Sequence, residues 1–130
     1  RSSMSTIIAS NISDGTTSVP STYVVNGSAK AWVNFNGTST VAIRDSLNVG
    51  SITDVGTGQY RVNFTNAMPD ANYSVIATVN GADTGTYEFN DSRHQALGVV
   101  LSPTYASVSS KHPAATAWYD VWQMSAAIFS

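Results

Sequence analysis

Apolar residues alternate with polar ones over much of this chain, and Gly, Asn, Asp and Pro interrupt the alternation at short intervals. Ala31, Val33 and Phe35 share one parity, while polar residues and Trp32 occupy the positions between them. A period of two is typical of a strand with one apolar face. The pattern therefore predicts a strand here with Trp32 on its other face.

The clearest predicted hairpin turns at Gly56-Thr57-Gly58. The strand after it, over residues 60–64, places its apolar residues on one face and directs Arg61 and Asn63 to the other. Asn36-Gly37 is a second tight-turn signal, because both residues tolerate positive φ. These turns join neighbouring strands into antiparallel pairs.

Other segments complete the predicted set of strands. Further strands are expected at 23–25, 41–43, 47–53, 73–80, 97–101, 105–108 and 118–129. The 73–80 segment is apolar at both parities, which favours a central strand buried on both faces. No segment has a helical period. Roughly eight to ten short strands at this spacing predict an all-β fold, an antiparallel β-sandwich of jelly-roll-like type.

The final segment is apolar on both parities. Its apolar residues are Trp118, Trp122, Met124 and Ile128 on one parity, and Tyr119, Val121 and Phe129 on the other. One face could pack the core and the other a neighbouring subunit. A central strand of a monomeric sandwich would show the same pattern.

The N-terminal 22 residues differ from the rest in composition. They are rich in Ser and Thr, with one short apolar pair at Ile7-Ile8 and turn chemistry over 11–20. We divide the chain into a connector or N-terminal arm at 1–22 and a β-sandwich domain at 23–130. The first segment either leads in from an upstream shaft or packs on the domain.

Composition narrows the possible partners. Charged residues make up only 11% of the chain, and Ser, Thr and Asn take their place, as suits turns and solvated strand faces. The net charge is −2 and the six basic residues are scattered, so no nucleic-acid partner is expected. Cysteine is absent, which excludes disulfides, and no apolar run is long enough to predict membrane insertion.

One polar segment holds the residue types that catalysis uses. Glu88, Asp91, Arg93 and His94 lie close together, but a solvated surface loop explains them equally well, and we do not predict an enzyme. Possible metal ligands are Asp83, Asp91, His94 and His112. Their spacing matches no zinc or EF-hand pattern, so no metal and no cofactor is assigned.

The same segment, 81–95, is the best candidate for recognition of a receptor. Aromatic rings stack on sugars, and short polar side chains bind their hydroxyls. The candidate receptor-binding residues are Tyr87, Phe89, Asn90, Asp91, Arg93 and His94. The tryptophans at 32, 118 and 122 could contribute, but a strand Trp more often belongs to the core or a subunit interface.

The run from 25 to 73 resembles a known β domain. The matching segments are VNGSAKAWVNFNGT at 25–38, VAIRDS at 41–46, YRVNFT at 60–65 and AMPDANY at 67–73. Together they resemble the domain near the C-terminus of tailed-phage fibres and other virion appendage proteins, especially those of phages of marine bacteria. The resemblance covers a little under half of the chain.

The resemblance implies a tail-fibre domain on the virion that recognises a host receptor. It implies a homotrimer, contact with other virion proteins, and a bacterial surface glycan or protein as receptor. It supplies no catalytic residue. A head-fibre or capsid-decoration protein could carry the same matching segments. A carbohydrate-binding module of a carbohydrate-active enzyme is the alternative from another functional class.

Overall fold

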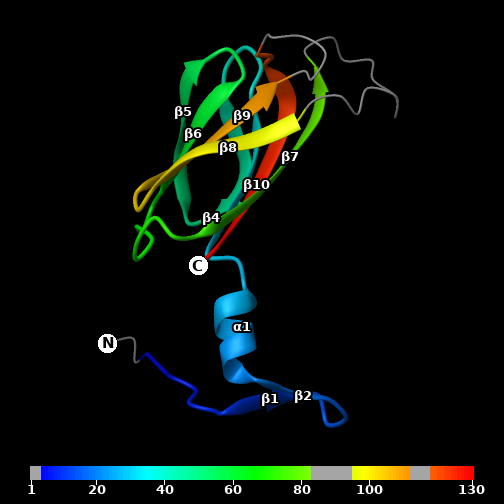
Figure 1. Ribbon diagram of the computed structural model, residues 1–130, viewed down its shortest axis with the longest axis vertical. Helices are drawn as coiled ribbons and strands as arrows, with labels where there is room; N and C mark the ends of the chain where they lie inside the picture. The colour runs from blue at the N-terminus through cyan, green and yellow to red at the C-terminus, as the bar shows by residue number, and fades with distance from the viewer. Residues whose placement is uncertain (1–3, 83–94, 112–117) are drawn as a thin grey trace.

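The computed structural model describes residues 4–82, 95–111 and 118–130. Two four-stranded antiparallel sheets pack face to face as a β-sandwich, so the predicted fold class is confirmed (Figure 1). The first sheet has the order β4 (Ala42–Leu47), β3 (Ala31–Asn36), β10 (Val121–Phe129) and β7 (Ser74–Ala82). The second sheet has the order β5 (Val49–Gly56), β6 (Gln59–Phe64), β9 (Tyr105–Lys111) and β8 (Gln95–Ser102).

The core fills the space between the two sheets. Alternate residues of β3, β6, β9 and β10 point inward, as the period of two requires. The fully buried side chains include Val33, Phe35, Tyr60, Val62, Val108, Val121, Met124 and Ile128. Phe35 and Tyr60 meet edge to face across the sandwich, with ring centroids 5.2 Å apart.

Both predicted hairpins form. The Gly56–Gly58 segment joins β5 to β6, and the segment after Asn36-Gly37 joins β3 to β4, with the positive φ at Ser39 and not at Asn36 or Gly37. The predicted 47–53 strand is divided, because Asn48 has φ 55 and turns the chain between β4 and β5. The Asn48 side chain donates to the carbonyls of Lys30 and Asn66, which fixes the crossing from one sheet to the other.

The prediction of a central strand at 73–80 is wrong. β7 pairs only with β10 and lies at the edge of its sheet. Its outward residues Ser74, Ile76 and Thr78 are exposed, and Ile76 retains 62% exposure. The apolar residues of one parity, Val75, Ala77 and Val79, pack against the core, whereas Ile76 lies on the outer surface.

The burial of β10 also departs from the predicted parity. Val121 and Met124 are both fully buried although they are three residues apart, so the alternation shifts between them. Trp122 consequently faces outward with 41% exposure, and Trp118 precedes the strand. β10 is a central strand, and none of the three tryptophans belongs to the buried core.

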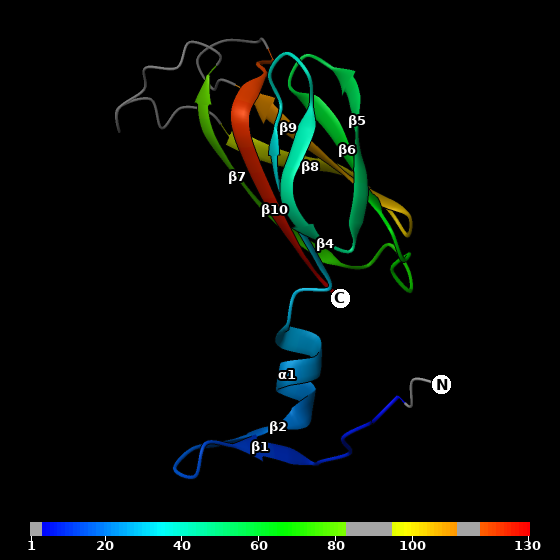
Figure 2. The ribbon, with the colours of Figure 1, turned by 180° about the vertical axis from the view of Figure 1, so that it is seen from behind.

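An N-terminal arm projects from one end of the sandwich (Figure 2). It contains a hairpin of β1 (Asn11–Ser13) and β2 (Ser18–Pro20), followed by the helix α1 (Ser21–Gly27). The predicted strand at 23–25 is therefore wrong, as is the expected lack of a helix. Since no strand of residues 4–82, 95–111 and 118–130 pairs with this segment, a helix is the conformation that satisfies its backbone groups locally. The proposed division at residue 22 falls inside α1.

Candidate functional site

The predicted receptor-binding residues of the 81–95 segment lie outside the described residues. These are Tyr87, Phe89, Asn90, Asp91, Arg93 and His94. The same holds for Glu88, Asp83 and His112. The structure therefore tests neither the proposed recognition loop nor the cluster considered for catalysis, and both stay predictions.

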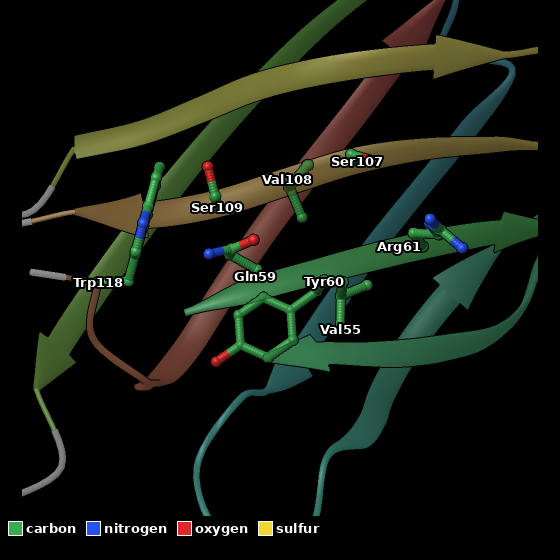
Figure 3. Close-up of a pocket in the computed structure, with 8 residues that line it drawn as sticks. All are labelled: Val55, Gln59, Tyr60, Arg61, Ser107, Val108, Ser109 and Trp118. Atoms are coloured by element: carbon green, nitrogen blue, oxygen red, sulfur yellow. The ribbon is translucent and has the colours of Figure 1, made fainter. Parts of the chain in front are cut away.

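Among the described residues, a groove lies on the outer surface of the second sheet (Figure 3). We call it the binding groove. It encloses about 230 Å³ and runs across β5, β6 and β9. Its lining residues are Val55, Gln59, Tyr60, Arg61, Ser107, Val108, Ser109 and Trp118.

The polar floor of the groove follows from strand alternation. Tyr60 and Val108 point into the core, so their neighbours Gln59, Ser107 and Ser109 face outward. Gln59 lies directly opposite Ser109 in the β6–β9 ladder. Ser109 is only 3% exposed and has an interaction partner of its own, so Gln59 and Ser107 are the more accessible of the three. These side chains offer an amide and hydroxyls, which can both donate and accept hydrogen bonds.

Trp118 forms one wall of the groove, at the left of Figure 3. It pairs with Lys111, the last residue of β9, in an isolated antiparallel bridge. The Lys111 ammonium lies 5.4 Å from the centroid of the Trp118 ring. This cation–π contact restricts the orientation of the indole, which is half-buried.

The segment that carries Trp118 is held against the sandwich by Asp120. Its carboxylate oxygen Oδ1 accepts the Gly58 backbone N–H at 2.7 Å and the Tyr60 hydroxyl at 2.9 Å. The Tyr119 N–H donates to the Ser110 carbonyl, which adds a backbone tie to β9. Trp118 is thus positioned by neighbours from both β6 and β9.

Tyr60 is a structural residue of this attachment. Its side chain is 1% exposed, and its hydroxyl lies 2.9 Å from the carbonyl oxygen of Gly37 as well as from Asp120. Burial, and then the hydrogen bond to Asp120, raise the pKa of Tyr60 far above its usual range. The phenol therefore stays protonated and cannot act as a base near neutral pH.

The opposite end of the groove carries a cation. Arg61 is exposed, and its guanidinium lies 5.0 Å from the centroid of the Tyr105 ring. Acidic residues are absent from the described lining. The groove thus combines an indole wall, an uncharged polar floor and a positive rim.

The described groups of the groove can form stacking contacts and hydrogen bonds with a ligand. The described lining contains no histidine and no carboxylate side chain. Within the described ranges, no group of three or more His, Cys, Asp or Glu side chains could hold a metal ion. An aromatic wall beside hydrogen-bonding groups is the usual design for holding a sugar ring.

A second surface lies on the outside of the first sheet. Trp32 faces Leu47 on one side and Ala127 on the other, and Ala127 faces Ile76, so an apolar row crosses all four strands. Small residues on β10 leave an open hollow of about 380 Å³ between Trp32 and Ile76. We call this surface the apolar trough. Its next row, which includes Asn34, Ser125 and Thr78, is polar.

Neither a protein-family model nor a curated protein nor a solved structure matches this chain. The residues themselves must therefore support any functional conclusion. Among the described helices, none is long and apolar enough to span a membrane.

Sequence reasoning found part of this groove and missed the rest. The alternation over 60–64 correctly turned Arg61 away from the core. Gln59, Ser107 and Ser109 were not singled out, although the same alternation around Tyr60 and Val108 could have found them. Trp118 was assigned to the last strand, because nothing local indicates that Asp120 attaches its segment to β6.

Proposed function

We propose that this chain is a recognition module of an external virion appendage, a tail-fibre domain that binds a glycan on the bacterial surface. The observation that carries the binding half of this proposal is the groove in which Trp118 stands beside Gln59, Ser107 and Ser109. Its volume of about 230 Å³ suits one or two sugar units more than a folded protein partner.

The appendage half of the proposal rests on the resemblance of residues 25–73 to fibre domains. This run supplies β3 to β6 and part of the buried core, including Phe35, Tyr60 and Tyr73. The resemblance thus covers residues that build the sandwich, while the groove wall at Trp118 lies beyond it. Fold and binding site are supported by separate observations.

The N-terminal arm favours an assembly over an isolated domain. A seven-residue helix and a hairpin of three-residue strands are both too short to be stable alone in water. Yet α1 buries no residue, and Met4, Ile7 and Ile8 are each more than 90% exposed. We assign these apolar side chains to contacts between copies in a homotrimer.

The apolar trough fits the same assembly. A row of four apolar side chains across a sheet face is a surface that a second copy would cover. Several copies would then present several grooves, and weak individual sites would act together through avidity. A head-fibre or decoration protein would use the same assembly at another place on the virion.

A carbohydrate-binding module of an enzyme is the second candidate, because the groove alone serves it equally well. The arm separates the two candidates, since its exposed apolar residues have a role in a fibre and none in a module carried as a monomer. The mass of the chain in solution therefore discriminates between them.

Binding to an array of immobilised bacterial surface oligosaccharides tests the proposed function. The wild-type chain should bind a subset of them, and Trp118→Ala should weaken that binding at least about tenfold, as expected for a central aromatic anchor. Trp122→Ala is the matched control, because Trp122 is exposed on the first sheet and should leave binding unchanged. Equal binding by wild type and Trp118→Ala would contradict the assignment of the groove.

A further inference from the structure

The four basic residues of the described chain fall into two groups. Lys30 donates through Nζ to the carbonyl oxygens of Val25 and Ser28. Arg44 donates to the carbonyl oxygens of Phe35 and Trp122. Both cations therefore use their N–H groups to satisfy the chain itself.

Arg61 and Lys111, the other two, are at the binding groove and differ from the first group in their hydrogen bonds. A ring contact does not distinguish them, because it is also made by Arg44, which lies 5.1 Å from the Trp122 ring centroid. Each lies over an aromatic ring, Arg61 over Tyr105 and Lys111 over Trp118. Neither has a hydrogen bond or a carboxylate partner in the part of the chain that the structure describes. Their N–H donors are left for solvent or a ligand.

Ring contacts leave these donors usable. A guanidinium stacked on an aromatic face still presents its in-plane N–H groups, which match the two oxygens of a carboxylate. The Tyr105 ring also limits the freedom of Arg61, so less entropy is lost when an anion binds. No acidic residue belongs to the described lining, and the nearby Asp120 carboxylate accepts hydrogen bonds from Gly58 and Tyr60.

We propose that the binding groove selects an acidic saccharide unit, a uronic acid or a related carboxylated sugar. The sugar ring packs on Trp118, its hydroxyls bind Gln59 and Ser107, and its carboxylate binds Arg61, with Lys111 adding positive potential beside the indole. This inference rests on the proposed function of the same groove and narrows it from any saccharide to an anionic one. The chain as a whole carries a net charge of −2, so the selectivity is local to this surface.

The test uses oligogalacturonates of matched length as free acids and as methyl esters, together with neutral hexose oligomers. Esterification removes the charge and keeps the sugar ring. The free acids should bind at least about tenfold more tightly than the esters, as a charge-assisted contact predicts. Arg61→Gln should abolish this preference, and raising the salt concentration should reduce it.

Two controls keep the outcomes distinct. Arg44→Gln makes the same change in charge on the other sheet and should leave the preference intact. Lys111→Gln should reduce the preference less than Arg61→Gln, because Lys111 contacts the Trp118 ring but is not among the groove-lining residues. Circular dichroism confirms that each variant is folded.

Trp118-dependent binding of esters or neutral oligomers as tight as that of the acids would overturn the acidic preference and leave the proposed function standing. A preference that survives Arg61→Gln would also overturn it. Absence of Trp118-dependent binding to every saccharide tested would overturn both.

Discussion

The Asp120 carboxylate accepts a hydrogen bond from the Tyr60 hydroxyl at 2.9 Å, which joins the start of β6 to the segment before β10. These residues are 60 positions apart in the chain. The same carboxylate oxygen accepts the Gly58 N–H. This small network determines where Trp118 stands, and hence whether the groove has a wall.

Tyr60→Phe should destabilise the domain while keeping its shape. The substitution removes a buried hydroxyl that bonds a charged acceptor, at an expected cost of about 1–3 kcal/mol in the free energy of unfolding. Tyr23→Phe is the control, because the Tyr23 side chain is 70% exposed on the arm and should change stability by less than about 0.5 kcal/mol. Chemical denaturation of both variants measures this change in the free energy of unfolding. Equal effects of the two substitutions would contradict the role given to the network.

Alkaline pH should destabilise the protein through the same tyrosine. The folded state holds Tyr60 protonated, whereas the unfolded state ionises it near pH 10, so stability is intact below about pH 10 and falls above it. The expected slope is at most about 1.4 kcal/mol per pH unit from this residue. Denaturation at a series of pH values should show a shallower decline for Tyr60→Phe. Burial also raises the pKa of Tyr73, so Tyr73 should account for the decline in stability that remains in Tyr60→Phe.

Gly58→Ala should be strongly destabilising, whereas Gly56→Ala in the same hairpin should not. Gly58 has φ +63, and a Cβ there would lie 2.5 Å from the Tyr119 carbonyl oxygen. The strain of holding an alanine in the left-handed region and this clash should together lower the free energy of unfolding by about 2 kcal/mol or more. A Cβ on Gly56 meets nothing within 4 Å. Similar melting temperatures for the two variants would show that the 118–120 segment does not pack on this turn.

Removing the apolar side chains of the arm should dissociate the assembly. The triple variant Ile7→Ser, Ile8→Ser and Tyr23→Ser changes only exposed residues, so the sandwich itself should keep its stability. Light scattering should give the mass of a trimer for the wild-type chain and a smaller mass for the variant. A monomeric wild-type chain would contradict the assembly and favour the carbohydrate-binding module.

Alternation predicted those features of the fold that depend on neighbours in the sequence. It located β3 and β6, gave the turn at Gly56–Gly58, and oriented Arg61 and Trp32 away from the core. These features follow from the period of two alone. The local pattern could not give the sheet order, so it took β7 for a central strand although only β10 lies beside it.

The site was less predictable than the fold because it depends on contacts distant in sequence. Trp118 lies at the groove because Asp120 binds Gly58 and Tyr60, and no motif around residue 118 encodes that attachment. The helix α1 is another such case. Tyr23, Val24 and Val25 suit a strand, yet no strand in the described part of the chain pairs with them, and they adopt a helix.

The most direct test of the central claim is an NMR titration of the indole N–H signals of the three tryptophans with an oligogalacturonate. Trp118 lines the binding groove, Trp32 lines the apolar trough, and Trp122 is exposed elsewhere on the first sheet. We predict a saturable shift of the Trp118 signal, with those of Trp32 and Trp122 unchanged. Shifts confined to Trp32 or Trp122, or none at all, would contradict the assignment of the groove as the saccharide site.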